Sequence, residues 1–301
     1  MTVLLAMILD AIFGEPKWLW DRQPHPAVLM GRLIGWADRR FNCGNNPWDR
    51  GIAVMALLVA GAMALGGAIQ ALPGIWADVI GGAILLAQKS LVDHVRAVAT
   101  GLRHSLDAGK QAVAMIVGRD TADMDQAAVS RAAIESAAEN FSDGIIAPLF
   151  WFVVAGVPGL LVYKITNTAD SMIGYRTPRH EQFGWAAARF DDLLNLIPAR
   201  LTALLFVATK PNLWKFVPIS KDANLHRSPN AGWPESALSR GLGVALSGPR
   251  AYHGEWTEFP WVNATGRREA NADDIDQSIR ELWKAWAIAL GGVLLLTVLC
   301  L

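Results

Sequence analysis

The sequence predicts an all-α, polytopic integral membrane protein with about four to five membrane segments and polar helices on the cytoplasmic side. Hydrophobic residues make up 52% of its 301 residues. Charged residues make up only 18%, where a soluble domain carries about 25%. Thirteen tryptophans stand against three tyrosines, and tryptophan is enriched at membrane–water interfaces. These observations exclude a disordered chain and disfavour a soluble enzyme.

The charge balance and the cysteines exclude further classes. Lys and Arg total 27, and so do Asp and Glu, so no basic excess points to a nucleic-acid partner. Cys43 and Cys300 are the two cysteines, too few and too far apart for a disulfide framework or a thiolate metal site.

The first apolar stretch, residues 1–13, predicts a retained helix that continues along the interface to Trp20. It has no basic leading region, contains Asp10 and runs into Gly14-Glu15-Pro16, so it does not read as a cleavable signal.

A hairpin of two membrane helices follows. Gly51 to Leu72 carries no charge over 22 positions, enough to cross a hydrocarbon core of about 30 Å. Pro73-Gly74 interrupts the pattern, and an apolar stretch then resumes. Basic residues flank both ends of the pair, which predicts cytoplasmic ends.

The third apolar run, 144–163, is interrupted at Gly156-Val157-Pro158-Gly159. Broken helices are tolerated at membrane depth where protein or a cavity satisfies the freed backbone groups. We therefore expect a re-entrant helix pair, with residues 120–143 and 164–192 on the same, cytoplasmic face. The whole chain, 1–301, is expected to form one membrane-embedded domain, with apolar segments near 51–72, 75–88, 144–163, 193–209 and 285–301.

Acidic residues precede the broken run. A helix is expected over about 125–140, with Asp123 as its N-cap, and the fourfold spacing of Glu135, Glu139 and Asp143 puts them on one face. Such a face is either a solvated acidic stripe or a site that holds a cation, since stacked carboxylates repel one another.

Polar clusters also follow the broken run. Asn167, Asp170 and Ser171 share a helix face with Lys164 one turn earlier, offering oxygens for Mg²⁺ and an ammonium for a phosphate. Arg189, Asp191, Asp192 and Asn195 repeat the pattern before the next apolar helix, which contains Arg200. The alternative is that these groups pair with one another and join the helices. The sequence has no P-loop, HExxH, CxxC or GxSxG motif.

Over nearly its full length the chain resembles the adenosylcobinamide-phosphate synthases, the CobD/CbiB family of membrane-bound cobalamin biosynthesis enzymes. The resemblance is carried, in order, by Gly14-Glu15-Pro16, His25-Pro26, Lys89-Ser90-Leu91, Val117-Gly118-Arg119-Asp120-Thr121, the motif-rich stretches 131–151, 163–175 and 183–201, and Ser228-Pro229-Asn230-Ala231-Gly232-Trp233-Pro234-Glu235-Ser236.

The resemblance implies an ATP-dependent amide ligase. Such enzymes join a propionate of (adenosyl)cobyric acid to the amine of an aminopropanol phosphate linker, giving (adenosyl)cobinamide phosphate. A carboxylate is a poor acyl donor, so phosphorylation by ATP would supply a leaving group, Mg²⁺ would neutralise the phosphates and a base would deprotonate the amine. An acyl-phosphate intermediate is our hypothesis from this chemistry.

Under this resemblance the predicted site residues fall into three sets. The catalytic set is Glu139, Asp143, Lys164 and Asp170. The Mg²⁺ set is Glu139, Asp143, Asp170, Asp191 and Asp192. The substrate-binding set is Glu15, His25, Lys89, Arg119, Asn140, Asn167, Ser171, Tyr175, Arg189, Asn195, Arg200, Asn230, Trp233 and Glu235.

Two other classes stay open. The AmpE-like regulatory membrane proteins are distant relatives without this enzyme activity, and Mg²⁺-dependent membrane prenyltransferases carry similar Asn and Asp clusters. The expected partners are cobyric acid, an amino-alcohol phosphate whose identity the sequence does not define, the lipid bilayer and other late-pathway membrane enzymes. An oligomer is left open. The expected location is the inner membrane of the cell.

Overall fold

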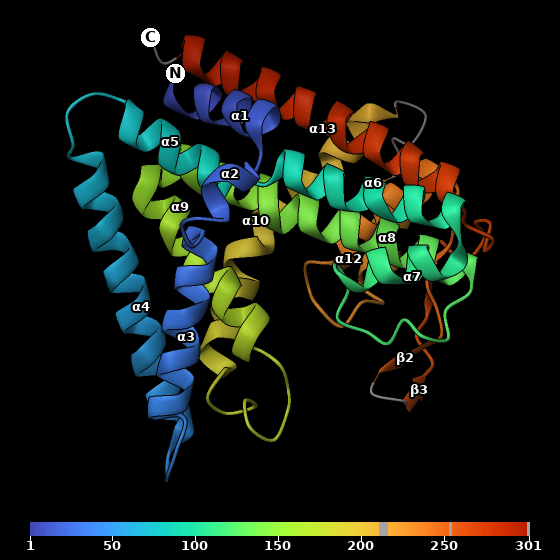
Figure 1. Ribbon diagram of the computed structural model, residues 1–301, viewed down its shortest axis with the longest axis horizontal. Helices are drawn as coiled ribbons and strands as arrows, with labels where there is room; N and C mark the ends of the chain where they lie inside the picture. The colour runs from blue at the N-terminus through green and yellow to red at the C-terminus, as the bar shows by residue number, and fades with distance from the viewer. Residues whose placement is uncertain (211–215, 253–254, 300–301) are drawn as a thin grey trace. The chain divides into compact units, whose positions relative to one another are not determined.

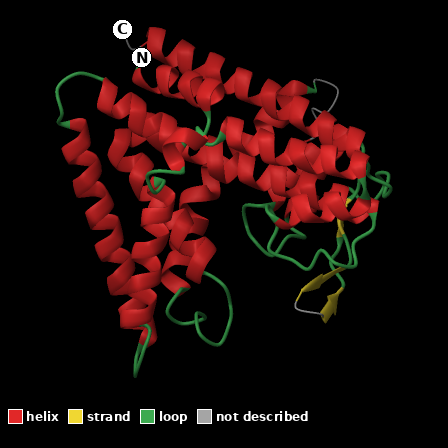
Figure 2. Ribbon diagram, viewed as in Figure 1, coloured by secondary structure: helices red, strands yellow, loops and turns green. Residues whose placement is uncertain are grey.

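The computed structural model describes residues 1–210, 216–252 and 255–299, and they are mostly helical (Figure 2). Within these residues four helical stretches are long and apolar enough to cross a membrane: Pro47–Gln70, Gln126–Ile173, Trp185–Thr209 and Ala272–Leu299. The prediction of an all-α, polytopic membrane protein is confirmed.

The chain packs as two compact units, one of residues 1–87 and 147–196 and the other of residues 88–146 and 197–301. The expectation of one domain over 1–301 stays a prediction.

The first unit contains helices α1 to α5, α9 and the beginning of α10. Its α1 packs on α5, and α3, α4 and α5 pack on α9 (Figure 1). Buried Ile34, Met55, Ile165 and Phe183 form the core among these helices. The bounds are α1 Thr2–Phe13, α2 Lys17–Trp20, α3 Pro26–Phe41, α4 Pro47–Gln70, α5 Trp76–Leu85, α9 Ala147–Ile173 and α10 Trp185–Thr209.

Two expectations for this unit need correction. The first helix does not continue to Trp20, because Gly14 has φ of 57° and Pro16 follows it, and α2 is a separate turn of helix. The hairpin after Gly51 forms, but its second limb, α5, has only ten residues, about 15 Å of helix. That length is about half a hydrocarbon core, so only α4 of the pair can span it.

The predicted interruption of the third apolar run is confirmed. Helix α9 breaks at Ala155, with φ −134° and ψ 18°, and at Gly156, with φ 63° and ψ −157°. A Cβ on Gly159 would lie 2.5 Å from the carbonyl oxygen of Trp151, eight residues earlier, whereas a straight helix separates such residues by about 12 Å. The chain therefore turns back sharply, and the side of the membrane on which each half lies stays a prediction.

The second unit is built around α6, which packs on α7, α8 and α13. Helix α8 presents small buried residues, among them Ala133 and Ala137, that let its neighbours approach closely. The bounds are α6 Gln88–His104, α7 Leu106–Ala114, α8 Gln126–Phe141, the π-helix η1 Ser142–Ile146, α11 Phe216–Ala223, α12 Gly232–Leu242 and α13 Ala272–Leu299.

Two features of this unit differ from expectation. Helix α8 is capped by Asp125, whose side chain accepts a 2.7 Å hydrogen bond from the Ala128 amide, so the prediction of Asp123 was wrong by two residues. Short strands that the sequence did not indicate also occur, in two antiparallel pairs. β1 (Leu246–Ser247) pairs with β4 (Trp261–Val262). β2 (Arg250–Tyr252) pairs with β3 (Glu255–Thr257), and Figure 1 labels this second pair.

Candidate active site

The acidic and amide residues of α9 and α10 meet in the first unit. Asp191, only 8% exposed, accepts hydrogen bonds from Asn167 Nδ2 at 3.3 Å and from Asn195 Nδ2 at 2.9 Å. Buried Tyr163 donates a 3.0 Å bond to Asn195 Oδ1, which fixes the orientation of that amide. Both Asp191 oxygens are therefore held in place by donors from two helices.

A second carboxylate, Asp170, lies within electrostatic reach of Asp191 and Asp192. Its position depends on Gly174, where a Cβ would lie 2.0 Å from Asp170 Oδ1. Only glycine leaves that space free. Asn167, Asp170, Asp191 and Asn195, which the sequence placed in two separate helical clusters, thus come together, and we call this group the acid–amide cluster.

The remaining predicted residues of α9 and α10 flank the cluster residues in sequence and have contacts of their own. Arg189 pairs with Asp192 at 3.1 Å. Lys164 is half-buried one turn before Asn167. Ser171 donates its hydroxyl hydrogen bond to the Thr168 carbonyl, and Tyr175 is exposed just after the end of α9.

The donor set of the acid–amide cluster suits a hard cation, since carboxylate and amide oxygens are the ligands that Mg²⁺ takes. Across residues 1–210, 216–252 and 255–299, no three His, Cys, Asp or Glu side chains form a ready-made metal cage. Mg²⁺ commonly needs only one or two carboxylates when substrate phosphates complete its shell. The residues present fit that mode, with Asp170 and Asp191 as the candidate ligands.

The acidic residues before the broken run belong to the second unit. Glu139 is exposed and Asp143 half-buried, and Asp143 lies in the π-helical turn η1. Such turns insert a residue into a helix and recur at functional sites. Glu135 does not share their environment: it is buried, pairs with Arg119 at 2.8 Å and accepts a 2.8 Å bond from the Ser247 amide.

That pairing changes the interpretation of Arg119. Its side chain and that of Glu135 are 8% and 7% exposed, so the guanidinium serves a buried ion pair within the unit. The geometry therefore favours a structural role over the predicted contact with a phosphate.

Residues from the late motif converge on Arg200, also in the second unit. Arg200 donates to Asn230 Oδ1 at 3.2 Å, and its guanidinium lies 4.7 Å from the centre of the Trp233 ring. Glu235, 4% exposed, has an oxygen 3.7 Å from His226 Nε2. The sequence predicted Arg200, Asn230, Trp233 and Glu235 as substrate contacts. It did not indicate that Arg200, from α10, lies against Asn230 and Trp233 of the late motif.

Several predicted substrate contacts also have partners within the fold. His25 Nδ1 accepts from the Ala27 amide at 3.2 Å and caps α3, while Nε2 lies 3.1 Å from the Ile84 carbonyl. Both ring nitrogens thus have partners within the fold, and a substrate contact by His25 stays a prediction. Lys89 forms an i, i+4 pair with Asp93, Asn140 bonds back to Ser136, and Glu15 is exposed.

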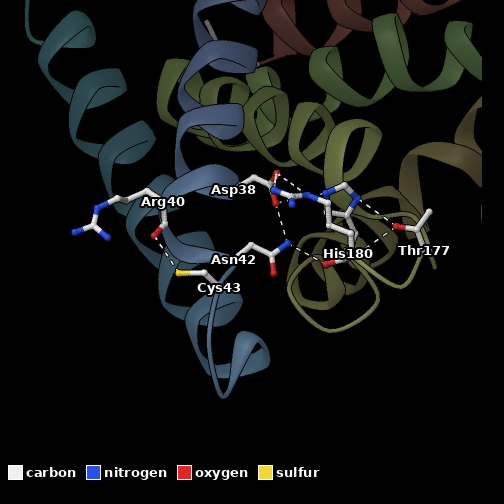
Figure 3. Close-up of polar contacts among 7 residues, drawn as sticks. Asp38, Arg40, Asn42, Cys43, Thr177 and His180 are labelled. Atoms are coloured by element: carbon white, nitrogen blue, oxygen red, sulfur yellow. Dashed lines mark hydrogen bonds and ion pairs between the residues drawn. The ribbon is translucent and has the colours of Figure 1, made fainter.

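Asp38, which was not among the predicted site residues, anchors the segment between α9 and α10 (Figure 3). Arg179 donates to Asp38 Oδ2 at 2.6 Å and 3.2 Å, and Asn42 to Oδ1 at 2.9 Å. His180 Nε2 lies 3.4 Å from Oδ1. Burial raises the pKa of Asp38, but the hydrogen bonds from Arg179 and Asn42 and the charges of Arg179 and His180 outweigh it. That pKa therefore lies below its ordinary 3.8. The sequence did contain a signal for this role, because Asp38 is an acidic residue on the apolar face of α3, beside Ile34 and Ala37.

The fold and this site define a multi-pass helical membrane protein in which acid and amide side chains gather where a broken helix meets its successor. The sequence model of the CobD/Cbib protein family matches residues 3–282, and the chain belongs to that family.

Curated relatives cover nearly the whole chain. Proteins named cobalamin biosynthesis protein CobD from Brucella anthropi and Sinorhizobium fredii are 48% and 46% identical to it, over 96% and 95% of this chain and 94% and 93% of theirs. The Rhodobacter capsulatus protein of that name is 46% identical over 90% of this chain and 89% of its own. The chain functions in cobalamin biosynthesis, and neither the AmpE-like nor the prenyltransferase alternative is favoured. No solved structure matches the chain.

Proposed function

We propose that the protein is an ATP-dependent amide ligase that joins an amino-alcohol phosphate to a propionate of (adenosyl)cobyric acid and so forms (adenosyl)cobinamide phosphate. The observation that carries the proposal is the acid–amide cluster, in a chain whose family relatives are named for cobalamin biosynthesis. The pre-oriented Asp191 and the adjacent Asp170 supply the oxygens that a magnesium–nucleotide complex requires.

The proposed reaction runs in two steps. A propionate oxygen attacks the γ-phosphorus of ATP, and ADP leaves. The linker amine then attacks the activated carbonyl carbon, inorganic phosphate leaves, and the amine proton passes to a carboxylate. Bound Mg²⁺ would neutralise the phosphate charge during transfer.

The chain's own residues would divide this work. Asn167 and Asn195 hold the Asp191 carboxylate by hydrogen bonds of 3.3 Å and 2.9 Å. Lys164 on α9 and Arg189 on α10 lie on the same two helices as Asp170 and Asp191. Their positive charges would bind the phosphates of the substrates. Glu139 and Asp143 stay candidates for the base or a metal ligand.

Arg200, Asn230 and Trp233 would contact the corrin. The Trp233 indole offers an apolar face, and the Arg200 guanidinium stacked 4.7 Å from its centre adds hydrogen-bond donors suited to peripheral amides. The substrate would then meet an aromatic and cationic surface.

Purified protein in detergent tests the reaction. Cobyric acid, candidate linkers and Mg²⁺–ATP are incubated with it, and products are identified by mass. Formation of cobinamide phosphate only when all components are present supports the proposal. Hydrolysis of ATP without a corrin product, or a requirement for an isoprenoid diphosphate, would refute it.

We further propose that this site faces the cytoplasm from the inner membrane. The two native cysteines are first replaced by alanine, and single cysteines are then introduced at Asp123 and Glu181. Labelling of both positions from the cytoplasmic side is expected in intact cells. Labelling from opposite sides would exclude the re-entrant arrangement of the broken run.

A further inference from the structure

An apolar groove of about 400 Å³ runs along the surface of the first unit, between α3 and α4 and over the second half of α9. Leu33 and Trp36 of α3, Leu57, Gly61 and Leu65 of α4, and Leu161 of α9 are among the residues that line it. The volume is in the range of ligand pockets, and the described lining residues are all apolar or aromatic.

The walls of the groove are open to the surroundings. Leu57 is 72% exposed and Leu65 57% exposed, both on α4, which is a candidate membrane span only 22% buried over its apolar window. At the depth of such a span the surrounding medium is hydrocarbon, so no water is available to fill the groove. The component of such a medium that matches the apolar lining of the groove is a lipid acyl chain.

One end of the groove is basic. Arg40 lies one helical turn beyond Trp36 and Ala37 on the groove-lining face of α3, and its guanidinium is 5.8 Å from the ring of Phe41, a lining residue. Figure 3 shows Arg40 directed away from Asp38 and His180.

The facing helix supplies a second guanidinium at the same end. Arg50 lies in the first turn of α4, four residues before the lining Val54, and donates to the Cys43 carbonyl. Among the described residues, neither Arg40 nor Arg50 forms an ion pair with a carboxylate. Asp49 lies about 100° away from Arg50 around the helix.

We propose that this groove is a binding site for an anionic phospholipid, with one acyl chain between α3 and α4 and the headgroup phosphate against Arg40 and Arg50. Guanidinium groups bind phosphate through paired hydrogen bonds, and a chain lying in the groove brings the phosphate to its basic end. The site is distinct from the acid–amide cluster and does not depend on the proposed reaction.

The experiment counts bound lipid by native mass spectrometry. The full chain is reconstituted with equal amounts of phosphatidylglycerol and phosphatidylcholine of identical acyl chains, extracted in mild detergent and weighed. The unmodified protein is expected to retain one phosphatidylglycerol in preference to phosphatidylcholine. Each of Arg40→Gln and Arg50→Gln should lower that preference about fivefold, the contribution of one basic residue at an anionic surface. Arg22→Gln, an exposed position outside α3 and α4, is the charge-matched control.

The groove itself is tested by filling it. A Cβ on Gly61 meets nothing within 4 Å, so Gly61→Leu can project into the groove without a clash. Gly67, also on α4 and equally open, does not line the groove, and Gly67→Leu is its matched control. Gly61→Leu should abolish retention of either lipid, and Gly67→Leu should leave it unchanged.

A second measurement does not require variants. A phosphatidylglycerol with a photoreactive acyl chain, cross-linked to the unmodified protein, should attach to peptides spanning 30–41 and 54–65. Attachment elsewhere would overturn the proposal. Equal retention of the two lipids would also overturn it, as would equal lipid loss in the Gly61 and Gly67 variants. A dimer mass that disappears in Gly61→Leu would show that a second copy of the chain occupies the groove, and this too would overturn the proposal.

Discussion

Asn195 donates a 2.9 Å hydrogen bond to Asp191 Oδ2 one turn earlier on α10, and its own carbonyl oxygen accepts from Tyr163 of α9 at 3.0 Å. This relay is buried and links the two helices that carry the acidic residues. It orients a carboxylate without neutralising it, because amides donate hydrogen bonds but carry no charge.

The first prediction concerns these acids. Asp170→Asn and Asp191→Asn keep size and polarity but remove a negative charge, and each should lower turnover by roughly 100-fold or more if the carboxylates hold magnesium–nucleotide. The measurement is corrin product per unit time, on protein that inserts and purifies normally. Asp21→Asn, an exposed position, is the control, and near-normal turnover in both cluster variants would show that the metal site is elsewhere. Asp143→Asn extends the same test to the second unit.

The second prediction concerns Lys164. Lys164→Met keeps the length of the stem and removes the ammonium, so the apparent KM for ATP or for the phosphorylated linker should rise while corrin affinity is retained. Steady-state kinetics with each substrate varied in turn provides the measurement. Lys17→Met, exposed on α2, controls for loss of charge. A defect confined to corrin affinity would reassign Lys164 to the corrin.

The third prediction concerns Gly174. The Cβ of Gly174→Ala would lie 2.0 Å from Asp170 Oδ1, so the carboxylate must move. We expect turnover per folded protein to fall about as far as in Asp170→Asn, together with a lower unfolding temperature, because the Cβ would also lie 2.7 Å from the Asp170 carbonyl oxygen. Gly81→Ala, where a Cβ meets nothing within 4 Å, should behave as the unmodified protein does. Equal activity of the two alanine variants would separate Asp170 from catalysis.

The fourth prediction concerns pH. Because the pKa of Asp38 is lowered by folding, its ionised form stabilises the fold at pH values above the ordinary 3.8, and this contribution is lost as pH falls through the lowered pKa. The unmodified protein should unfold at a higher temperature than Asp38→Asn at pH 7, and the difference should shrink below pH 3.8. Thermal unfolding in detergent at both pH values measures it. A difference independent of pH would contradict the assignment.

The elements that the sequence predicted best are those defined by long uncharged runs or strong breakers. The span from Gly51 and the interruption at Gly156 follow from hydropathy and from glycine beside proline, both local properties. Spacing within each helix predicted that Asn167 and Asp170 share a face of α9 and that Asp191 and Asn195 share a face of α10. The approach of those helices was not predicted, since it depends on packing.

Other features required knowledge of distant partners. The burial of Glu135 depends on Arg119 and on the Ser247 amide, 112 residues away, which no spacing rule reveals. His25 was placed among substrate contacts by resemblance, and its ring also caps α3 and bonds to Ile84. The role of Asp38 rests on a partner 141 residues later.

The most direct test of the proposed reaction traces the oxygen atoms of the reacting carboxylate. Cobyric acid labelled with ¹⁸O in its reactive carboxylate is incubated with the purified protein, Mg²⁺–ATP and the amino-alcohol phosphate. The proposed reaction predicts cobinamide phosphate together with inorganic phosphate that carries one ¹⁸O, since phosphate leaves with a carboxylate oxygen. A corrin amide formed without ATP, or with no label in phosphate, would contradict it.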